Sequence, residues 1–185
     1  QGIPYAARLL QGQRPAAGRS PSVVGPAPRS RLQRAGLLIA VDTNLLVYAH
    51  REDSEWHGAA CARITALAEG RARWAIPWPC LHEFLAIATH PRIFSPPTPL
   101  AAALDQIEAW LESPSVVLLT EDGDYWPAWR ALVEDARVAG PEVHDARIAA
   151  LCLHHGIDEL WTADRDFNRY PNLTVRNPLV GKRHE

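Results

Sequence analysis

The chain has 185 residues, of which 47% are hydrophobic and 22% charged, a composition typical of a globular protein with one sizeable domain. No apolar run is long enough to span a membrane. The formal net charge is -2. The three cysteines (Cys61, Cys80 and Cys152) are scattered, which argues against a disulfide framework or a zinc site and favours a reducing compartment.

The charge is divided unevenly along the chain. Residues 1–36 contain six arginines, five prolines and no acid, and they are too poor in apolar residues to fold alone. We expect a disordered N-terminal extension here, or upstream sequence outside the native product, followed by a folded body over 37–185. That body has 13 basic and 21 acidic residues, net -8, which argues against broad electrostatic binding of nucleic acid. An acidic pocket that a divalent cation neutralises remains compatible with it.

The body alternates between apolar runs and amphipathic segments. The run at 37–41 stops at Asp42 and is too short for a helix, so it predicts a buried parallel strand. Two helices follow, and Ser54 is expected to cap the second, which Gly70 ends. Later segments predict strands over 74–76, 116–119, 159–162 and 173–175, and helices over 80–89, 100–111, 125–138 and 143–154. This alternation predicts an α/β fold with a parallel sheet covered on both faces.

The helix predicted over 125–138 contains two tryptophans. Trp126 and Trp129 recur with Leu132 and Val133 at helical spacing, which predicts that they face the core. A base-stacking surface is the alternative.

Five acids occupy informative positions. Asp42 ends the first strand, and Asp164 follows the fourth strand with Asp166 two residues later. In a parallel sheet these strand ends share one edge, where open α/β sheets form their binding crevice. Asp145, at the start of the Ala-rich helix, would share that edge. Glu83 lies inside a helix amid apolar neighbours and is costly to bury unless paired or metal-bound.

Carboxylates packed together repel, so some must take up protons or a cation must lie among them. Oxygen ligands without clustered His or Cys favour Mg²⁺ or Mn²⁺, and such a site activates water and stabilises charge on a phosphoryl group. The alternative is a set of helix caps and surface acids, since Asp42, Asp145 and Asp164 each fit a cap. From the residues alone the two interpretations are evenly balanced.

A resemblance bears on this choice. The segments that carry it are Val41-Asp42-Thr43-Asn44, His82-Glu83-Phe84, His144 to Ala150 and Trp161 to Phe167. In order and spacing they resemble the signatures of PIN-domain ribonucleases, above all the VapC toxins of bacterial toxin–antitoxin pairs, over about residues 37–180. The resemblance implies a three-layer α/β/α sandwich with a central, mainly parallel sheet of about five strands.

The resemblance also implies a site and its cofactor. Metal would be held by Asp42, Glu83, Asp145 and Asp164, which would also be the catalytic acids, with Asp166 as a further ligand. Mg²⁺ is the implied ion, with Mn²⁺ as a substitute. The hydroxyl of Thr162 is expected near the metal or its water.

The function implied is that of an endoribonuclease toxin, in which activated water attacks a phosphodiester of RNA. The implied partners are a cognate antitoxin and a second copy of the chain, and the implied location is the cytoplasm. An antitoxin arginine would compete with the metal, and an apolar helix would lie in a groove near Trp56, Trp74 or Trp78. A non-catalytic cation- or partner-binding module of the same fold is the alternative.

Basic side chains near the acids have two interpretations. Arg147, Arg165 and Arg169 would hold RNA phosphates or form ordinary ion pairs, and the sequence leaves both open. His82 and His144 each precede a proposed ligand; a surface or satisfied core histidine is favoured over a general base.

Overall fold

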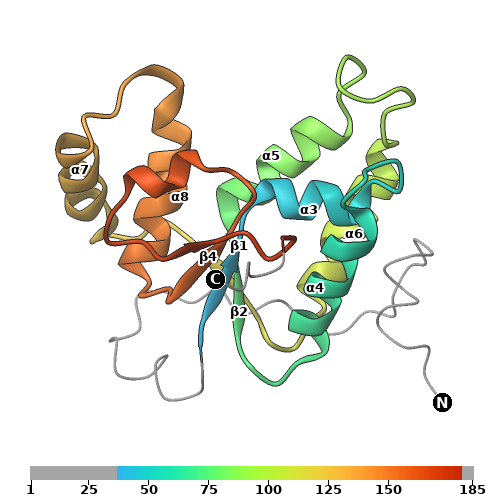
Figure 1. Cartoon of the computed structure of the whole chain (residues 1–185), viewed down its shortest axis with the longest axis horizontal. Helices are drawn as coiled ribbons and strands as arrows, with labels where there is room; N and C mark the ends of the chain where they lie inside the picture. The colour runs from blue at the N-terminus through green and yellow to red at the C-terminus, as the bar shows by residue number, and fades with distance from the viewer. Residues whose placement is uncertain (1–36, 181–185) are drawn as a thin grey trace.

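The computed structural model describes residues 37–180, and the expected N-terminal extension lies outside this range. Five strands form one sheet between two groups of helices (Figure 1). The strands are β1 (Ile39–Val41), β2 (Trp74–Pro77), β3 (Val116–Leu119), β4 (Glu159–Trp161) and β5 (Val175–Arg176). All four pairings between neighbouring strands are parallel, which confirms the predicted α/β sandwich.

The helices lie close to their predicted positions. They are α3 (Thr43–His50), α4 (His57–Glu69), α5 (Trp78–Ala88), α6 (Leu100–Leu111), α7 (Tyr125–Asp135) and α8 (Val143–His154), with short 3₁₀ helices η2 (Gly140–Glu142) and η3 (Asp166–Arg169). Ser54 does not cap α4, because the hydroxyl accepts the Trp56 amide while the helix begins only at His57. In residues 37–180 no helix has the length and apolar character needed to cross a membrane.

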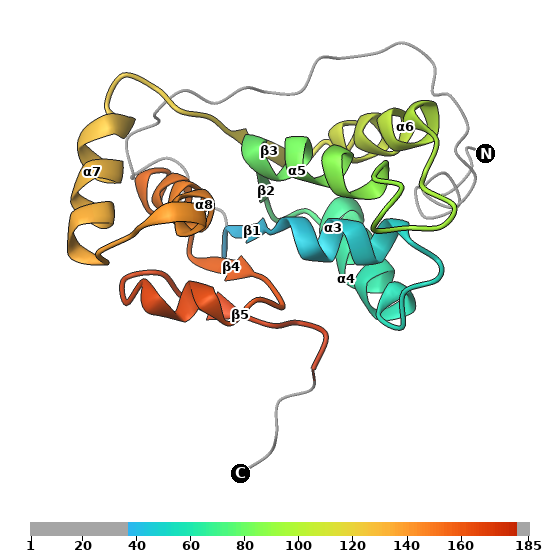
Figure 2. The ribbon, with the colours of Figure 1, turned by 90° about the horizontal axis from the view of Figure 1, so that it is seen from above.

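The topology explains where a site can form. The sheet order is β3-β2-β1-β4-β5. The chain steps outward from β1 to β3 and then crosses back past two strands to β4, so α3 to α6 lie on one side of the sheet and α7 and α8 on the other (Figures 1 and 2). The direction of strand addition reverses beside β1. In doubly wound sheets this reversal opens a crevice at the carboxyl ends of the strands, and Asp42 follows β1 there.

The core is built from the sheet and the helix faces that cover it. Every residue of β1, β2 and β3 is buried, as expected for parallel strands covered on both sides. Helix α5 buries Leu81, Phe84 and Ala88, which confirms most of its predicted stripe. Phe84 packs edge-on against Trp110 of α6, with ring centroids 4.8 Å apart. This packing fixes the face of α5 that carries the apolar stripe and leaves the opposite face toward α8.

Helix α7 differs from its prediction. Trp126 is 60% exposed, and Trp129, Leu132 and Val133 are only partly buried. The prediction that Trp126 faces the core is therefore wrong. The physical reason is that α7 packs mainly along α8 at the outside of the molecule, so it needs only one narrow apolar stripe. The ring of Trp126 lies beside that of Trp129 instead, with centroids 5.4 Å apart.

Candidate active site

Asp42 joins the end of β1 to the start of α3. Its Oδ1 accepts the backbone N–H of Thr43 at 2.7 Å, so the residue is the N-cap of α3. Its Oδ2 accepts hydrogen bonds from Asn44 Nδ2 at 2.6 Å and Thr162 Oγ1 at 2.7 Å. The side chain is only 4% exposed. The Asp42 carboxylate therefore caps α3 and also lies at the crevice.

Thr162 and Asn44 connect the ends of β1 and β4. The Thr162 hydroxyl also accepts hydrogen bonds from Asn44 Nδ2 at 2.8 Å and from the Asp164 amide at 3.0 Å. Asn44 Oδ1 accepts the amide of Ala163 at 3.0 Å. Thr162 therefore lies at the crevice, where its contacts are with Asp42, Asn44 and the backbone, and its place near a metal or its water stays a prediction. No pattern in the sequence indicates this role of Asn44 apart from its position two residues after Asp42.

Glu83 enters the site from α5. Its Oε2 accepts a hydrogen bond from Thr43 Oγ1 at 2.6 Å, so a second residue of the first signature segment acts within the site. Glu83 is exposed rather than buried among apolar residues, because the buried stripe of α5 lies on the other side of the helix. It lines a cavity of about 320 Å³ together with His82, His144 and Arg147.

Three further acids meet beside this cavity. Asp145 stands in the first turn of α8, and Asp164 and Asp166 follow β4. One carboxylate oxygen from each lies within 4.8 Å of the other two. Asp164 Oδ1 also accepts the amide of Asp166 at 2.8 Å, which fixes the turn that brings these two residues together. Acids from the start of α8 and from the loop after β4 thus form one group.

Burial dominates the electrostatics of Asp42. It raises the pKa of this carboxyl to about 6, and the negative charges of Glu83 and Asp145 act in the same direction. The hydrogen bonds from Thr162 and Thr43 oppose the rise. The hydrogen-bond donors therefore favour the charged form of Asp42, whereas burial and the neighbouring acids favour its neutral form.

Asp145 shows the repulsion expected among the acids. Its pKa is raised by burial, and then by the charges of Asp164, Glu83 and Asp166. Such a group favours a bound cation, because the cation removes the repulsion that the protons otherwise relieve. The ligand atoms available are all carboxylate oxygens, which fits Mg²⁺ or Mn²⁺.

The arginines near the acids differ in their contacts. Arg147 pairs with Glu121 at 2.5 Å, and Arg169 pairs with Glu142 at 2.7 Å. Arg165 is exposed and makes no salt bridge with the rest of residues 37–180. Ordinary ion pairing therefore describes two of the three.

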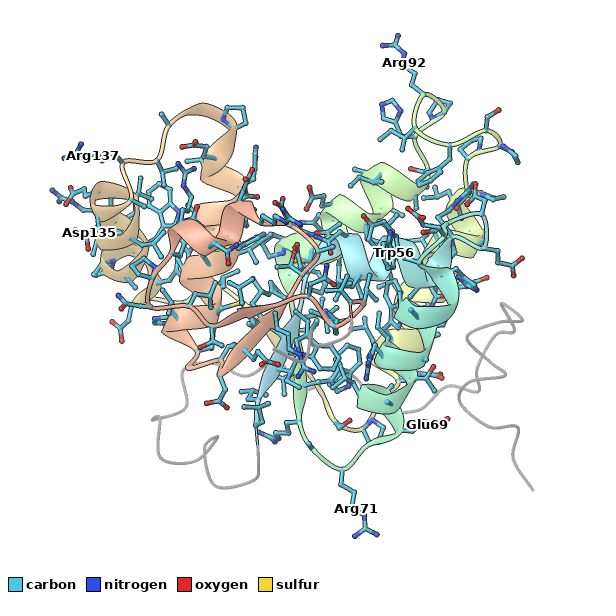
Figure 3. The ribbon with its side chains drawn as sticks, viewed as in Figure 1. Trp56, Glu69, Arg71, Arg92, Asp135 and Arg137 are labelled. Atoms are coloured by element: carbon cyan, nitrogen blue, oxygen red, sulfur yellow. The ribbon has the colours of Figure 1, made fainter. Side chains whose placement is uncertain are left out.

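The tryptophans considered for a partner groove also differ. Trp74 is fully buried in β2, so the prediction that a partner helix would lie in a groove near it is wrong. Trp78 is 39% exposed and packs edge-on against His82, with ring centroids 5.4 Å apart. Trp56 is half-buried, just before α4, and is labelled in Figure 3.

The sequence is similar to that of a known protein family. Residues 39–173 match the sequence profile of the PIN domain. Ribonuclease VapC43 of Mycobacterium tuberculosis is 33% identical over 147 residues, which cover 80% of this chain and 99% of the relative. Ribonuclease VapC48 of the same species is 30% identical over 140 residues, covering 76% and 97% of the two chains.

Solved structures show the same fold. VapBC2 from Rickettsia felis, crystallised with a DNA fragment from its promoter, aligns with a TM-score of 0.56 at 17% identity, covering 76% of this chain and 98% of that one. The Sarcin-Ricin loop cleaving toxin VapC20 of M. tuberculosis aligns with a TM-score of 0.52 at 21% identity, covering 70% and 92%.

Proposed function

The chain belongs to the PIN-domain family and has VapC ribonucleases as relatives, and from this premise we propose that it is a metal-dependent endoribonuclease, the toxin of a toxin–antitoxin pair. One observation about the site supports this proposal in addition to the family match. Asp145, Asp164 and Asp166 converge at the sheet edge where the direction of strand addition reverses, with Asp42 and Glu83 beside them. The crevice is therefore lined by the ligands that a hard cation requires.

Asp42, Asp145, Asp164 and Asp166 are the proposed metal ligands, with Glu83 at the edge of the same group. Mg²⁺ is the proposed ion, and Mn²⁺ is expected to substitute for it. When bound, the cation would supply an activated water and stabilise charge on the phosphoryl group. Asp42 would contribute a ligand whose position is fixed, because the Thr43 amide and the Asn44 and Thr162 side chains hold its two oxygens.

Glu83 has the placement expected of a proton acceptor. It is solvent-exposed, lines the cavity between α5 and α8, and is held from one side by the Thr43 hydroxyl. It would take the proton from the attacking water. His82 and His144 line the same cavity and remain the alternative carriers of that proton.

RNA phosphates need positive charge in a body that is acidic overall. Arg165 is the proposed contact, since it is exposed beside Asp164 and pairs with no acid within residues 37–180. Arg147 and Arg169 would have to leave Glu121 and Glu142 first. Replacing Arg165 by Gln should therefore weaken RNA binding more than replacing Arg169 by Gln.

The competing function is a non-catalytic module that binds a cation or a partner with the same acids. Incubation of RNA with the protein and Mg²⁺, with and without EDTA, separates the two. We expect cleavage that EDTA abolishes and that Asp42→Asn lacks, with products that carry linear phosphate ends because water attacks. Intact RNA would favour the module. Cyclic phosphate ends would show attack by the RNA 2′-hydroxyl instead.

Such an enzyme in the cytoplasm needs an inhibitor, and we propose an antitoxin as partner and a second copy of the chain as a homodimer. The solved VapBC2 structure from Rickettsia felis supports the antitoxin partner. A partner arginine fits the acidic group because its planar fork pairs with two carboxylate oxygens at once. Saturating antitoxin should then lower Mn²⁺ affinity in calorimetry, and excess Mn²⁺ should weaken the complex by the same factor. Equal Mn²⁺ affinities in both titrations would place inhibition elsewhere.

A further inference from the structure

A second group of metal-binding side chains lies away from the acidic crevice. His154 ends α8 and His155 follows it, whereas Asp145 stands near the start of the same helix. Asp145 and His154 are nine positions apart along this helix, which corresponds to about 14 Å. Asp122, in the loop between β3 and α7, completes the group, and one ligand atom of each of the three residues lies within 4.8 Å of the others. The two groups are therefore separate sites.

The contacts of Asp122 leave one of its oxygens unsatisfied. Oδ1 lies 2.9 Å from His154 Nε2 and also accepts the amide of Asp124. Oδ2 is buried and has no hydrogen-bond partner among residues 37–180. A buried carboxylate oxygen without a partner is costly, and a bound cation would remove that cost. An ion pair between Asp122 and His154 satisfies only Oδ1.

His155 is prepared as a ligand by the backbone. It is 7% exposed, and its Nε2 lies 2.8 Å from the carbonyl oxygen of Thr120. That carbonyl can only accept, so Nε2 carries a hydrogen, and in the neutral form of the ring the lone pair lies on Nδ1. Metal-bound histidines usually donate their second ring nitrogen to a carbonyl or carboxylate in this way. The ring of His154 contacts that of His155 edge-on, with centroids 5.0 Å apart.

We propose that Asp122, His154 and His155 form a zinc site that fixes the β3–α7 loop to the end of α8. Two imidazoles and one carboxylate favour Zn²⁺ over Mg²⁺, and with both oxygens of Asp122 bound the three residues would supply four protein ligand atoms, as in a closed structural site. Coordination by both oxygens of Asp122 would supply the partner that Oδ2 lacks. In this arrangement His154 binds through Nε2 and gives up its hydrogen bond to Asp122.

The loop held in this way reaches the active site. Glu121 precedes Asp122 and pairs with Arg147, which lines the cavity beside Glu83. Tyr125, at the other end of the loop, donates its hydroxyl to the carbonyl of Arg147 at 3.2 Å. The zinc site would therefore be structural, and it would hold the wall of the catalytic cavity from a distance.

The test is a titration of the full chain with Zn²⁺ alone, in competition with a chromophoric chelator. We expect one tight equivalent that survives in Asp145→Asn, which weakens the acidic crevice. The affinity should fall at least about 100-fold in His154→Gln and in Asp122→Asn, since each removes a ligand. His90→Gln is the matched control, because His90 is exposed and lies in a different loop. Circular dichroism would show that each variant is folded.

A second pair of side chains could also bind zinc, and the experiment must distinguish it from the proposed site. The thiol of Cys61 lies 3.8 Å from the His57 ring, and this pair also has the chemistry to bind zinc. Cys61→Ser should keep the tight equivalent if the proposal is right. Co²⁺ bound to the unaltered chain should give visible bands without a sulfur-to-cobalt charge-transfer band. A sulfur band, loss of binding in Cys61→Ser, unchanged affinity in His154→Gln, or no tight equivalent in the unaltered chain would each overturn the proposal.

Discussion

Thr162 donates a hydrogen bond to Asp42 across 120 residues of sequence, with 2.7 Å between its Oγ1 and Oδ2 of Asp42. The same hydroxyl accepts from Asn44 and from the amide of Asp164. One small side chain therefore sets the positions of a residue just after β1, one in α3 and one in the loop after β4. The geometry of the crevice depends on this contact because the two strands end side by side.

Replacing Thr162 by Val should disturb both the charge and the stability of the site. The hydrogen bond lowers the pKa of Asp42, so its loss should raise that pKa further above about 6. Asn44 also loses an acceptor, and the free energy of unfolding should fall by about 1–3 kcal/mol. Urea unfolding and a carboxyl NMR titration measure the two effects. Thr162→Ser keeps the hydroxyl and should behave like the unaltered protein; equal stability of the Val and Ser variants would contradict the assignment.

The raised pKa of Asp42 predicts how metal-free stability depends on pH. The folded protein keeps this proton up to about pH 6, whereas the unfolded chain loses it near 3.8. The folded state therefore binds more protons in this interval, and stability falls as pH rises through it. The shift corresponds to roughly 3 kcal/mol between pH 4 and pH 7. Urea unfolding in EDTA should show this fall relative to Asp42→Asn; a constant difference between the two proteins would refute it.

Metal affinity should show the opposite pH dependence. The proposed ligands bind metal only when deprotonated, and the pKa values of Asp42 and Asp145 are both raised. Mn²⁺ binding should release protons and weaken as the pH falls from 7 to 5, by up to about tenfold per unit for each proton displaced. Calorimetry in two buffers of different ionisation enthalpy measures that release. Identical affinities at pH 7 and pH 5 would count against these ligands.

Much of the fold follows from patterns within single segments. The helix bounds at 100–111 and 143–154 and the strand at 116–119 agree with the prediction, because apolar spacing and the flanking Pro and Gly residues determine them locally. The last strand lies at Val175–Arg176 rather than 173–175, since two residues on a sheet edge carry little pattern. Asp42 was recognisable because an apolar run stops there.

Contacts between distant segments were less predictable. The exposure of Trp126 depends on how α7 lies on α8, and that of Glu83 depends on which face of α5 meets the sheet. Thr43 and Asn44 act through partners on α5 and beyond β4. Asp122 lies 32 residues before His154, and no local spacing connects them. These relationships arise only once the helices are packed on the sheet.

The N-terminal 36 residues are predicted to be dispensable. They lie outside the PIN match at 39–173, and the first strand begins at Ile39. Leu38 must be kept, because its amide donates to Asp158 and its carbonyl accepts the amide of that residue. A chain beginning at Leu37 should unfold at the same urea concentration and cleave RNA at the same rate. Insoluble protein after the deletion would instead assign the extension a structural role.

The single-turnover rate of RNA cleavage by Asp145→Asn, measured as a function of Mn²⁺ concentration, shows whether the acids at the crevice hold a catalytic metal. Asp135→Asn is the matched control, because Asp135 is an exposed acid on α7, far from the crevice (Figure 3). We predict that Asp145→Asn cleaves at least about 100-fold more slowly at Mn²⁺ concentrations that saturate the unaltered protein. The control should keep the full rate. An Asp145→Asn rate equal to that of the control, at the same Mn²⁺ concentration, would contradict a catalytic metal held by these acids.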